Sequence, residues 1–380
     1  MGIIDRYLLR KFLQTFLICF VSLFGLYVLI ELSTNLDNFV RGGEKFGEVL
    51  QFVAQYYSFR AVWFFDRVSG FLALISAMFT VAWIQRHNEM IALMAAGVSR
   101  LRVLVPIILA VAVISLLSVV NRELLIPRFR EELSRRPQDP VGDQPQSLEK
   151  RYDFRTEVYF DGKNTYARQK RIELPDFRLP LRLSGYGKKL SAESAYYRPA
   201  EGDRPSGYLF DGVKEPKNLD GRASLLLEGR PVLLTPHDYP HWLKPDQCFL
   251  VSDLTFDQLA GGTTFKQLSS TAELIRGLRN PSADFGADVR TTVHARIVQP
   301  LLDITLLFLG LPLVVGRESR NVFIAMGLCM GLNVAFMLVV FASQQMGSIS
   351  FWPFTPAFAA WFPLMIFAPL AAGLAELLWR

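Results

Sequence analysis

The chain has 380 residues, of which 51% are hydrophobic and 20% are charged, and its mean hydropathy is +0.24. These values are unusual for a water-soluble protein and predict an integral membrane protein. The formal net charge of +6 comes from 41 basic and 35 acidic residues without a polybasic block outside the apolar runs, so we expect no nucleic-acid partner. Three cysteines, two of them within apolar runs, are too few for a disulfide framework.

Six apolar segments are each long enough to cross a bilayer, because a hydrocarbon core about 30 Å thick needs roughly 20 helical residues. Three precede a long polar interval and three follow it. They cover residues 12–30, 68–84, 103–120, 297–315, 322–342 and 356–378. A signal peptide is the alternative for the first segment, but no small-residue cleavage site follows it, which favours a retained span.

The basic residues indicate the orientation of these spans, since cytoplasmic flanks retain Lys and Arg. With six spans, four groups of basic residues fall on one side of the membrane. They are Arg6, Arg10 and Lys11; Arg86, Arg100 and Arg102; Arg317 and Arg320; and Arg380. The opposite loops are uncharged at 346–355 and of mixed charge at 37–60. We therefore expect both termini in the cytoplasm.

The long polar interval has the pattern of a β-domain. Short apolar runs alternate there with turn pairs such as Asp161-Gly162 and Asp211-Gly212. Many short strands predict a sandwich or jelly roll. The expected fold is therefore a membrane α-helical protein with a 3+3 arrangement of spans and an inserted external all-β, jelly-roll-like domain. The expected parts are residues 1–122 with three spans, 123–290 with the β-domain and its linkers, and 291–380 with three spans.

Motifs for catalysis are absent from the sequence: G-x-x-x-x-G-K-[ST], G-x-S-x-G and H-E-x-x-H do not occur. His237 and His241 have the spacing of helical metal ligands, but Pro236 and Pro240 oppose a helix there. We expect no catalytic residue, no metal site and no cofactor.

Asp303 is the clearest ionisable residue inside a span. As part of a proton relay it would need partners at similar depth, and only His294 and Arg296 lie near, at one boundary. We prefer a carboxyl group bonded within the helical bundle beside Pro300.

Three arginines near the outer ends of the second and third spans are candidate ligands for an anionic lipid head group. Arg60 and Arg67 lie about two helical turns apart, and Arg122 is expected at the same level. Guanidinium groups hold phosphate through paired, charge-assisted hydrogen bonds. The alternative is structural, with Arg67 paired to Asp66 or Glu31 and Arg122 extended to the interface.

Residues 86–100, RHNEMIALMAAGVSR, lie between the second and third spans. Their apolar residues recur at intervals of three and four, which predicts a short amphipathic helix at the membrane surface. Such a helix by itself is also compatible with simple contact with lipid.

This stretch resembles the cytoplasmic coupling helix of the lipopolysaccharide-export permeases, the LptF/LptG (YjgP/YjgQ) family. Its features are a Glu, an apolar run and a small-x-Gly ending, which Glu89, Ala95 and Gly97 match. The resemblance extends to IIDRYLLRKFLQTF at the start, QLSSTAELIRGL before the fourth span and HARIVQPLLDITLLFLGLPL around it. It implies that Glu89 is an anionic contact for an ATPase and that neighbouring apolar side chains fill a groove there. The implied coupling residues are Glu89, Met90, Leu93, Met94 and Gly97.

The resemblance also implies a setting and partners. The setting is the bacterial inner membrane, with a periplasmic jelly roll. The partners are a paralogous permease (LptF or LptG), a cytoplasmic LptB-like ATPase dimer, periplasmic LptC/LptA-like bridge proteins and lipopolysaccharide. LIELSTNLDNF in the first span is slightly more similar to LptG. Family members tend to carry Lys near the outer end of this span, whereas this chain has Glu31 and Asp37, so phosphate contacts are not carried over to that place.

Two other functions remain as alternatives. In a macrolide-exporter-type permease the external domain follows the first of four spans, whereas here three spans precede it. A membrane-anchored scaffold would use its β-domain to bind an envelope partner without transport. In either the transporter or the scaffold an exposed strand edge would join a partner's sheet, and residues 156–160 and 249–256 are the segments that we would probe.

Overall fold

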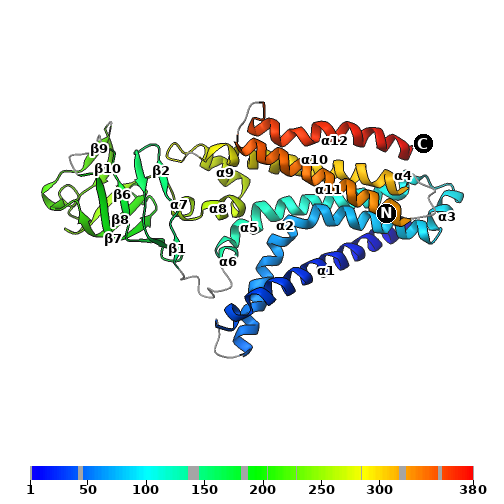
Figure 1. The fold of residues 1–380 in the computed structure, drawn as a ribbon, viewed down its shortest axis with the longest axis horizontal. Helices are drawn as coiled ribbons and strands as arrows, with labels where there is room; N and C mark the ends of the chain where they lie inside the picture. Colours follow the sequence, from blue (N-terminus) through cyan, green and yellow to red (C-terminus); the bar gives the residue numbers. More distant parts are fainter. Residues whose placement is uncertain are drawn as a thin grey trace. The chain divides into compact units, whose positions relative to one another are not determined.

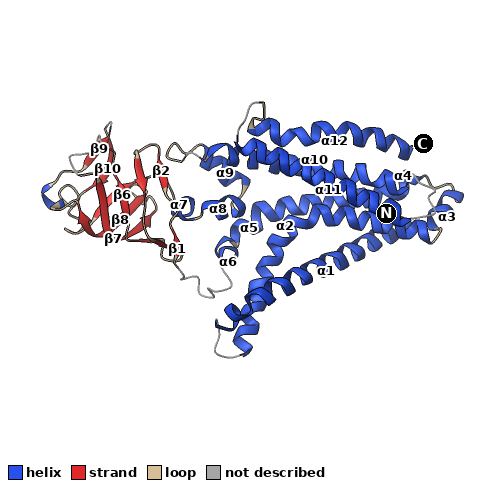
Figure 2. Cartoon of the chain, viewed as in Figure 1, coloured by secondary structure: helices blue, strands red, loops and turns tan. Residues whose placement is uncertain are grey.

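The computed structural model describes residues 2–41, 46–135, 145–180, 187–202, 204–227, 229–283, 285–315, 322–349 and 353–379. The chain forms two compact units, one helical and one built mainly of strands (Figures 1 and 2). The helical unit comprises Met1–Leu133, Ser270–Ala272 and Gly286–Arg380. The β unit comprises Ser134–Ser269 and Glu273–Phe285.

Six helices in the described part of the chain are long and apolar enough to cross a membrane. They are α1 (Ile3–Arg41), α2 (Phe46–Arg86), α4 (Arg100–Val120), α10 (Gly286–Val315), α11 (Val322–Ile349) and α12 (Pro356–Trp379). Each predicted span lies within one of them, so the six spans and their 3+3 division are confirmed. The beginning of α1, the end of α12 and the short helix α3 (Glu89–Ala95) lie at the same end of the helical unit (Figure 1).

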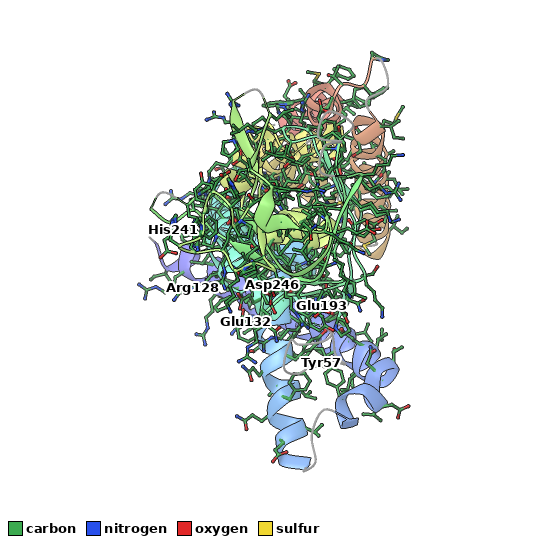
Figure 3. The ribbon with its side chains drawn as sticks, turned by 90° about the vertical axis from the view of Figure 1, so that its left-hand side faces the viewer. Tyr57, Arg128, Glu132, Glu193, His241 and Asp246 are labelled. Carbon is green, nitrogen blue, oxygen red and sulfur yellow. The ribbon has the colours of Figure 1, made fainter. Side chains whose placement is uncertain are left out.

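The first two helices are longer than predicted. At 1.5 Å per residue, the 39 residues of α1 would measure about 58 Å as a straight helix, nearly twice the apolar thickness of a bilayer, and the helix is kinked at Asn35. The loop expected at 37–60 is wrong at residues 37–41, which belong to α1, and from Phe46 onward, where α2 is already helical. An aromatic cluster explains the extension: Phe39 of α1 is buried with Tyr56 and Tyr57 of α2. Tyr57, labelled in Figure 3, is directed toward α1.

The remaining core of the helical unit surrounds α10, which packs against α2, α4, α11 and α12. Apolar side chains from all five helices form one cluster, including Leu74, Leu104 and Phe336. Gly70 allows a close approach of two helices: a Cβ atom there would lie 2.6 Å from the Asp303 Oδ1 atom. The small residue therefore leaves room for a carboxyl group between α2 and α10.

Further short helical segments follow α4 or precede α10 in the described residues. A π-helical turn, η1 (Asn121–Leu125), follows α4 directly and leads into α5 (Ile126–Arg128) and α6 (Arg130–Ser134). The segment before α10 contains α7 (Phe256–Ala260), α8 (Gly262–Leu268) and α9 (Thr271–Leu278). Thr255 begins α7 with a capping box, in which its side chain and that of Gln258 bond each other's backbone N–H groups.

The β unit is an antiparallel sheet that does not close, with eleven strands in its described residues. They are β1 (Gln146–Ser147), β2 (Arg151–Asp153), β3 (Val158–Phe160), β4 (Asn164–Tyr166), β5 (Arg171–Glu173), β6 (Asp176–Arg178), β7 (Lys189–Arg198), β8 (Gly207–Glu215), β9 (Leu225–Leu227), β10 (Arg230–Leu234) and β11 (Cys248–Val251). The main order is β1-β4-β5-β7-β8-β11-β10-β9. The long β7 also pairs with β6, which continues to β3 and β2. The prediction of an inserted β-domain is confirmed, although the unit also contains the short helices α7 and α8.

The strand edges differ from those expected. β3 pairs with both β2 and β6, and β11 pairs with both β10 and β8, so residues 158–160 and 248–251 are internal strands. The physical reason is burial: Val158, Phe160 and the whole of β11 face the core. Within the described sheet, β1, β2 and β9 are the strands with one open edge.

Candidate functional site

The helix α3 ends in a defined stop. The Val98 N–H donates to the Leu93 carbonyl at 3.0 Å, and the Gly97 N–H donates to the Met94 carbonyl at 2.9 Å. This pair of bonds is a Schellman motif, which needs a left-handed residue after the helix. Gly97 supplies it with φ of +82°. A Cβ atom at Gly97 would meet nothing within 4 Å, so the glycine is required by the backbone rather than by a close neighbour.

Glu89 opens α3 and is held by the first helix. The Tyr7 Oη atom lies 3.2 and 3.0 Å from the two Glu89 carboxylate oxygens. The predicted anionic contact therefore already has one partner inside the chain.

Met90 is placed inside the bundle. It is 4% exposed and is buried in one cluster with Leu8, Ile84 and Val103. Leu93 and Met94 pack against the same cluster. The role of Met90 in a groove of an ATPase stays a prediction, and within this chain the apolar face that the sequence pattern identifies packs against the bundle.

The outward face of α3 carries different residues. Ile91 is 61% exposed, and Ala92, Ala95 and Ala96 are exposed with it. The sequence pattern missed Ile91 because it falls between the residues spaced at three and four. On a seven-residue helix whose Met90 and Leu93 face inward, the position of Ile91 would have indicated an outward-facing side chain.

A buried ion pair joins α2 to the end of α4. Arg122 Nε lies 2.8 Å from Asp66 Oδ1, and both side chains are at most 14% exposed. The Ser118 hydroxyl also donates to Asp66, and Asn121 Nδ2 donates to the Val62 carbonyl at 2.9 Å. The predicted structural alternatives placed Arg67 on Asp66 and Arg122 at the interface, whereas Arg122 is the partner of Asp66.

The π turn brings a second carboxylate into this region. Glu123 accepts hydrogen bonds from the Thr271 N–H, at 2.8 Å, and from the Thr271 hydroxyl. Thr271 is the first residue of α9, and a carboxylate at a helix N-terminus is favoured by the orphan N–H groups there. π turns recur at functional sites, and this one places Arg122 and Glu123 on different partners.

Asp303 is bonded within the bundle, as preferred. Ser115 Oγ donates to its Oδ2 atom at 3.0 Å, and Gln299 Nε2 donates to its Oδ1 atom at 2.9 Å. The helix α10 continues through Pro300 without a break. No group of three or more His, Cys, Asp or Glu side chains suited to a metal ion occurs among the described residues.

The three predicted arginines separate into two places. Arg67 and Arg122 both lie within electrostatic range of Arg296. Asp66 and Glu123 lie within the same range. Arg60 instead bonds the Tyr56 hydroxyl at 2.9 Å, and that hydroxyl donates to Glu31. Arg67 is exposed, with its guanidinium 5.5 Å from the centre of the Trp63 ring.

Arg296 was not identified as a site residue from the sequence. It lies in α10 and is partly buried. A basic residue within a span is itself a signal, since an unpaired charge costs on the order of 3 kcal/mol at mid-bilayer.

Six candidate spans, a short helix between the second and third and an inserted open sheet define a multi-pass membrane protein with an inserted β-domain. The model of the family described as lipopolysaccharide export system permease LptF/LptG matches residues 6–173 and 236–379, which is most of the chain. The chain belongs to the LptF/LptG family, and the resemblance found in the sequence is confirmed. It is thus a transporter permease of the inner membrane and not itself an enzyme. Among curated proteins no match is found.

Proposed function

We propose that this chain extracts lipopolysaccharide, or a related glycolipid, from the outer leaflet of the inner membrane as one of two paired permeases driven by a separate cytoplasmic ATPase. The family match carries this proposal, because it includes both halves of the helical unit and the segment of α3. In this proposal the short surface helix α3 contacts the ATPase and moves with it, and the polar groups of the helical unit contact the lipid.

Two observations support the proposed orientation. The four groups of basic residues fall on one side by the positive-inside rule. The beginning of α1, α3 and the end of α12 lie at one end of the helical unit (Figure 1). Both termini and α3 are therefore cytoplasmic in our proposal, and the β unit, which follows an odd number of spans, is periplasmic.

ATPase docking uses the outward face of α3. Ile91 supplies the exposed apolar side chain, and Glu89 the charge, while Met90, Leu93 and Met94 fix the helix to the bundle. Gly97 ends the helix and sets the course of the chain into α4. A push on α3 would reach α1 through the bond between Tyr7 and Glu89 and would reach α2 and α4 through the packing of Met90.

Substrate contact uses the cationic group formed by Arg67, Arg122 and Arg296. Arg67 is the exposed member, so it meets a phosphate first. Arg122 is held by Asp66 and adds its positive charge to the region that the phosphate approaches. Arg60, bound to Tyr56 and through it to Glu31, lies on the hairpin of α1 and α2 and is a second, separate contact.

The periplasmic partners would join the β unit at an open edge. LptC/LptA-like bridge proteins could extend the sheet at β1, β2 or β9, whose outer sides have unpaired backbone groups. Photo-crosslinkers therefore belong on these strands rather than on β3 or β11.

Copurification with the ATPase tests the proposal and separates it from a scaffold. Ile91→Glu should weaken docking roughly 10- to 100-fold, since burial of a large apolar side chain contributes about 1.5 to 3 kcal/mol. Leu226→Glu, at a side chain 60% exposed in β9, is the matched control and should leave docking unchanged. Normal copurification and export in both Ile91→Glu and Glu89→Lys would favour a helix that only rests on lipid.

A further inference from the structure

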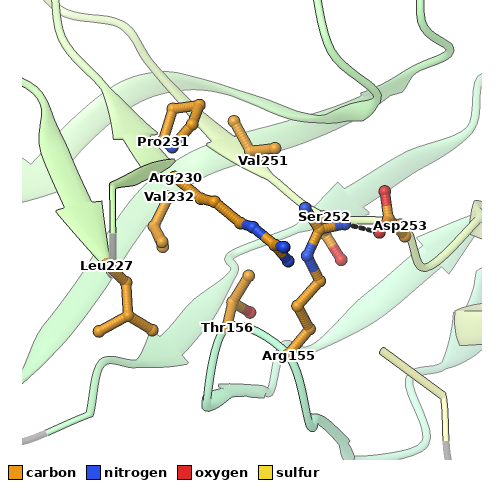
Figure 4. Close-up of a pocket in the computed structure, with 9 residues that line it drawn as sticks. All are labelled: Arg155, Thr156, Leu227, Arg230, Pro231, Val232, Val251, Ser252 and Asp253. Atoms are coloured by element: carbon orange, nitrogen blue, oxygen red, sulfur yellow. Dashed lines mark hydrogen bonds and ion pairs between the residues drawn. The ribbon is translucent and has the colours of Figure 1, made fainter. Parts of the chain in front are cut away.

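A small pocket in the β unit brings two arginines together (Figure 4). Arg155 enters it from the turn after β2, and Arg230 enters from the start of β10. Val232 and Val251 form part of its apolar wall. The cavity volume is about 50 Å³, above the roughly 10–15 Å³ that a cavity needs to hold one water molecule. The pocket has room for a group of several atoms.

The charges in the pocket are unequal. Arg155 forms an ion pair with Asp253, whereas the side chain of Arg230 makes no ion pair or hydrogen bond with the described residues. Figure 4 shows the two guanidinium groups approaching each other from opposite walls. Two like charges so placed repel each other, and one carboxylate balances only one of them. Arg230 is therefore the guanidinium in the pocket that has no carboxylate partner among the described residues, although the buried Asp153 beside Arg155 offsets part of the total charge.

Thr156 adds an unused polar group to this wall. The residue is 5% exposed, and its Oγ1 atom has no hydrogen-bond partner among the described residues. The turn that carries it is fixed, because the buried Asp153 accepts from the N–H groups of Arg155 and Thr156 at 2.9 and 3.2 Å. Asp153 also accepts from the Ser252 hydroxyl at 2.7 Å. A buried hydroxyl without a partner is unfavourable, and rotation of the Thr156 side chain about its Cα–Cβ bond would turn it toward an acceptor in the pocket.

We propose that this pocket binds a phosphate group, held by Arg230, Arg155 and the Thr156 hydroxyl. A phosphate offers several oxygens to donors on different sides, which suits two planar guanidinium forks and one hydroxyl. Arg155 has five N–H donors, more than its pair with Asp253 uses, so it contributes without losing that partner. Arg230 lies outside the residues that match the family model, so family membership does not assign it this role.

Inorganic phosphate and the purified full-length chain in detergent provide the first test. Phosphate should raise the thermal unfolding temperature at constant ionic strength, by mass action on the folded state. Arg230→Gln should weaken the apparent affinity roughly 10- to 100-fold, the value of a charge-assisted hydrogen bond, and Thr156→Val should weaken it by a smaller factor. Arg230 is exposed, so its replacement leaves folding intact. Arg198→Gln, an exposed arginine at the end of β7 outside the pocket, is the control and should keep the affinity within about twofold.

A second arm identifies the source of the phosphate. A detergent-soluble glycolipid with one phosphate is compared with its dephosphorylated form in the same assay. Competition between this lipid and inorganic phosphate, lost in Arg230→Gln, supports the pocket and assigns it to a lipid head group. Binding of inorganic phosphate alone supports a pocket for the free anion. Absence of any Arg230-dependent binding, or an equal loss in Arg198→Gln, overturns the proposal. None of these outcomes depends on the ATPase, so the proposed transport function is tested separately.

Discussion

The Tyr7 hydroxyl lies within 3.2 Å of both carboxylate oxygens of Glu89, and so the start of the first helix is bonded to the start of the short helix α3. These residues are 82 positions apart in the chain. The bond makes α1 a direct recipient of any movement of α3.

Tyr7→Phe should separate docking from coupling. It removes one hydroxyl and leaves the Glu89 charge, so copurification with the ATPase should stay unchanged. The bond is partly exposed, so the free energy of unfolding should fall by less than about 1 kcal/mol. Lipid-stimulated ATP turnover of the assembled complex should fall severalfold. Tyr152→Phe, at a similarly exposed tyrosine of β2, is the control. Normal turnover in Tyr7→Phe would show that movement does not pass through this bond.

Gly97 is predicted to matter through its backbone conformation. Gly97→Asn should be tolerated, since Asn adopts left-handed geometry with little cost, whereas Gly97→Val should destabilise the chain by about 1 to 2 kcal/mol. Thermal unfolding in detergent and copurification with the ATPase measure the two effects. If Asn and Val impaired docking equally without loss of stability, the small size of Gly97 at an interface would be its role instead.

The pair of Asp66 and Arg122 should behave as a buried ion pair. Asp66→Asn leaves the Arg122 charge without its carboxylate and should lower stability by roughly 3 kcal/mol, because breaking one side of a buried pair is costly. Asp66→Asn with Arg122→Gln should recover much of that loss. A double-mutant cycle on thermal unfolding measures the coupling. Additive effects of the two changes would mean that the pair contributes nothing beyond its separate contacts.

Cys248 should be chemically silent in the folded protein. It lies in β11 with no exposed surface, and burial raises the pKa of its thiol because the charged thiolate is disfavoured there. At pH 8 a maleimide should label it only after unfolding, while a cysteine placed at the exposed Gln169 reacts at once. Labelling is followed by mass spectrometry. Fast modification of Cys248 in the native chain would contradict its buried position. Topology reporters consequently belong at Gln169 rather than at Cys248.

The spans were predictable because each contains an apolar run near 20 residues. The extension of α2 was not, since Gln51, Gln55 and Ser58 interrupt the apolar run although they continue the helix. Hydropathy measures transfer into lipid and does not detect a helix stabilised by aromatic contacts, such as those of Tyr56 with Phe39.

The site was only partly predictable for a similar reason. Periodicity placed Met90 on an apolar face without telling whether that face meets the bundle or a partner. Asp66 was weighed as a partner for its neighbour Arg67, but the carboxylate bonds Arg122, 56 positions away. Pairing over such distances depends on how helices pack, which residue spacing alone does not contain.

The π turn at Asn121–Leu125 makes the end of α4 sensitive to length. A π turn accommodates one residue more than an α turn, so the side chains beyond it are rotated by about 100° relative to a continuous α-helix. Removal of one residue there would keep the segment helical, yet Arg122 and Glu123 could no longer both meet Asp66 and Thr271. Evolution of this segment is therefore freer to exchange side chains than to gain or lose a position.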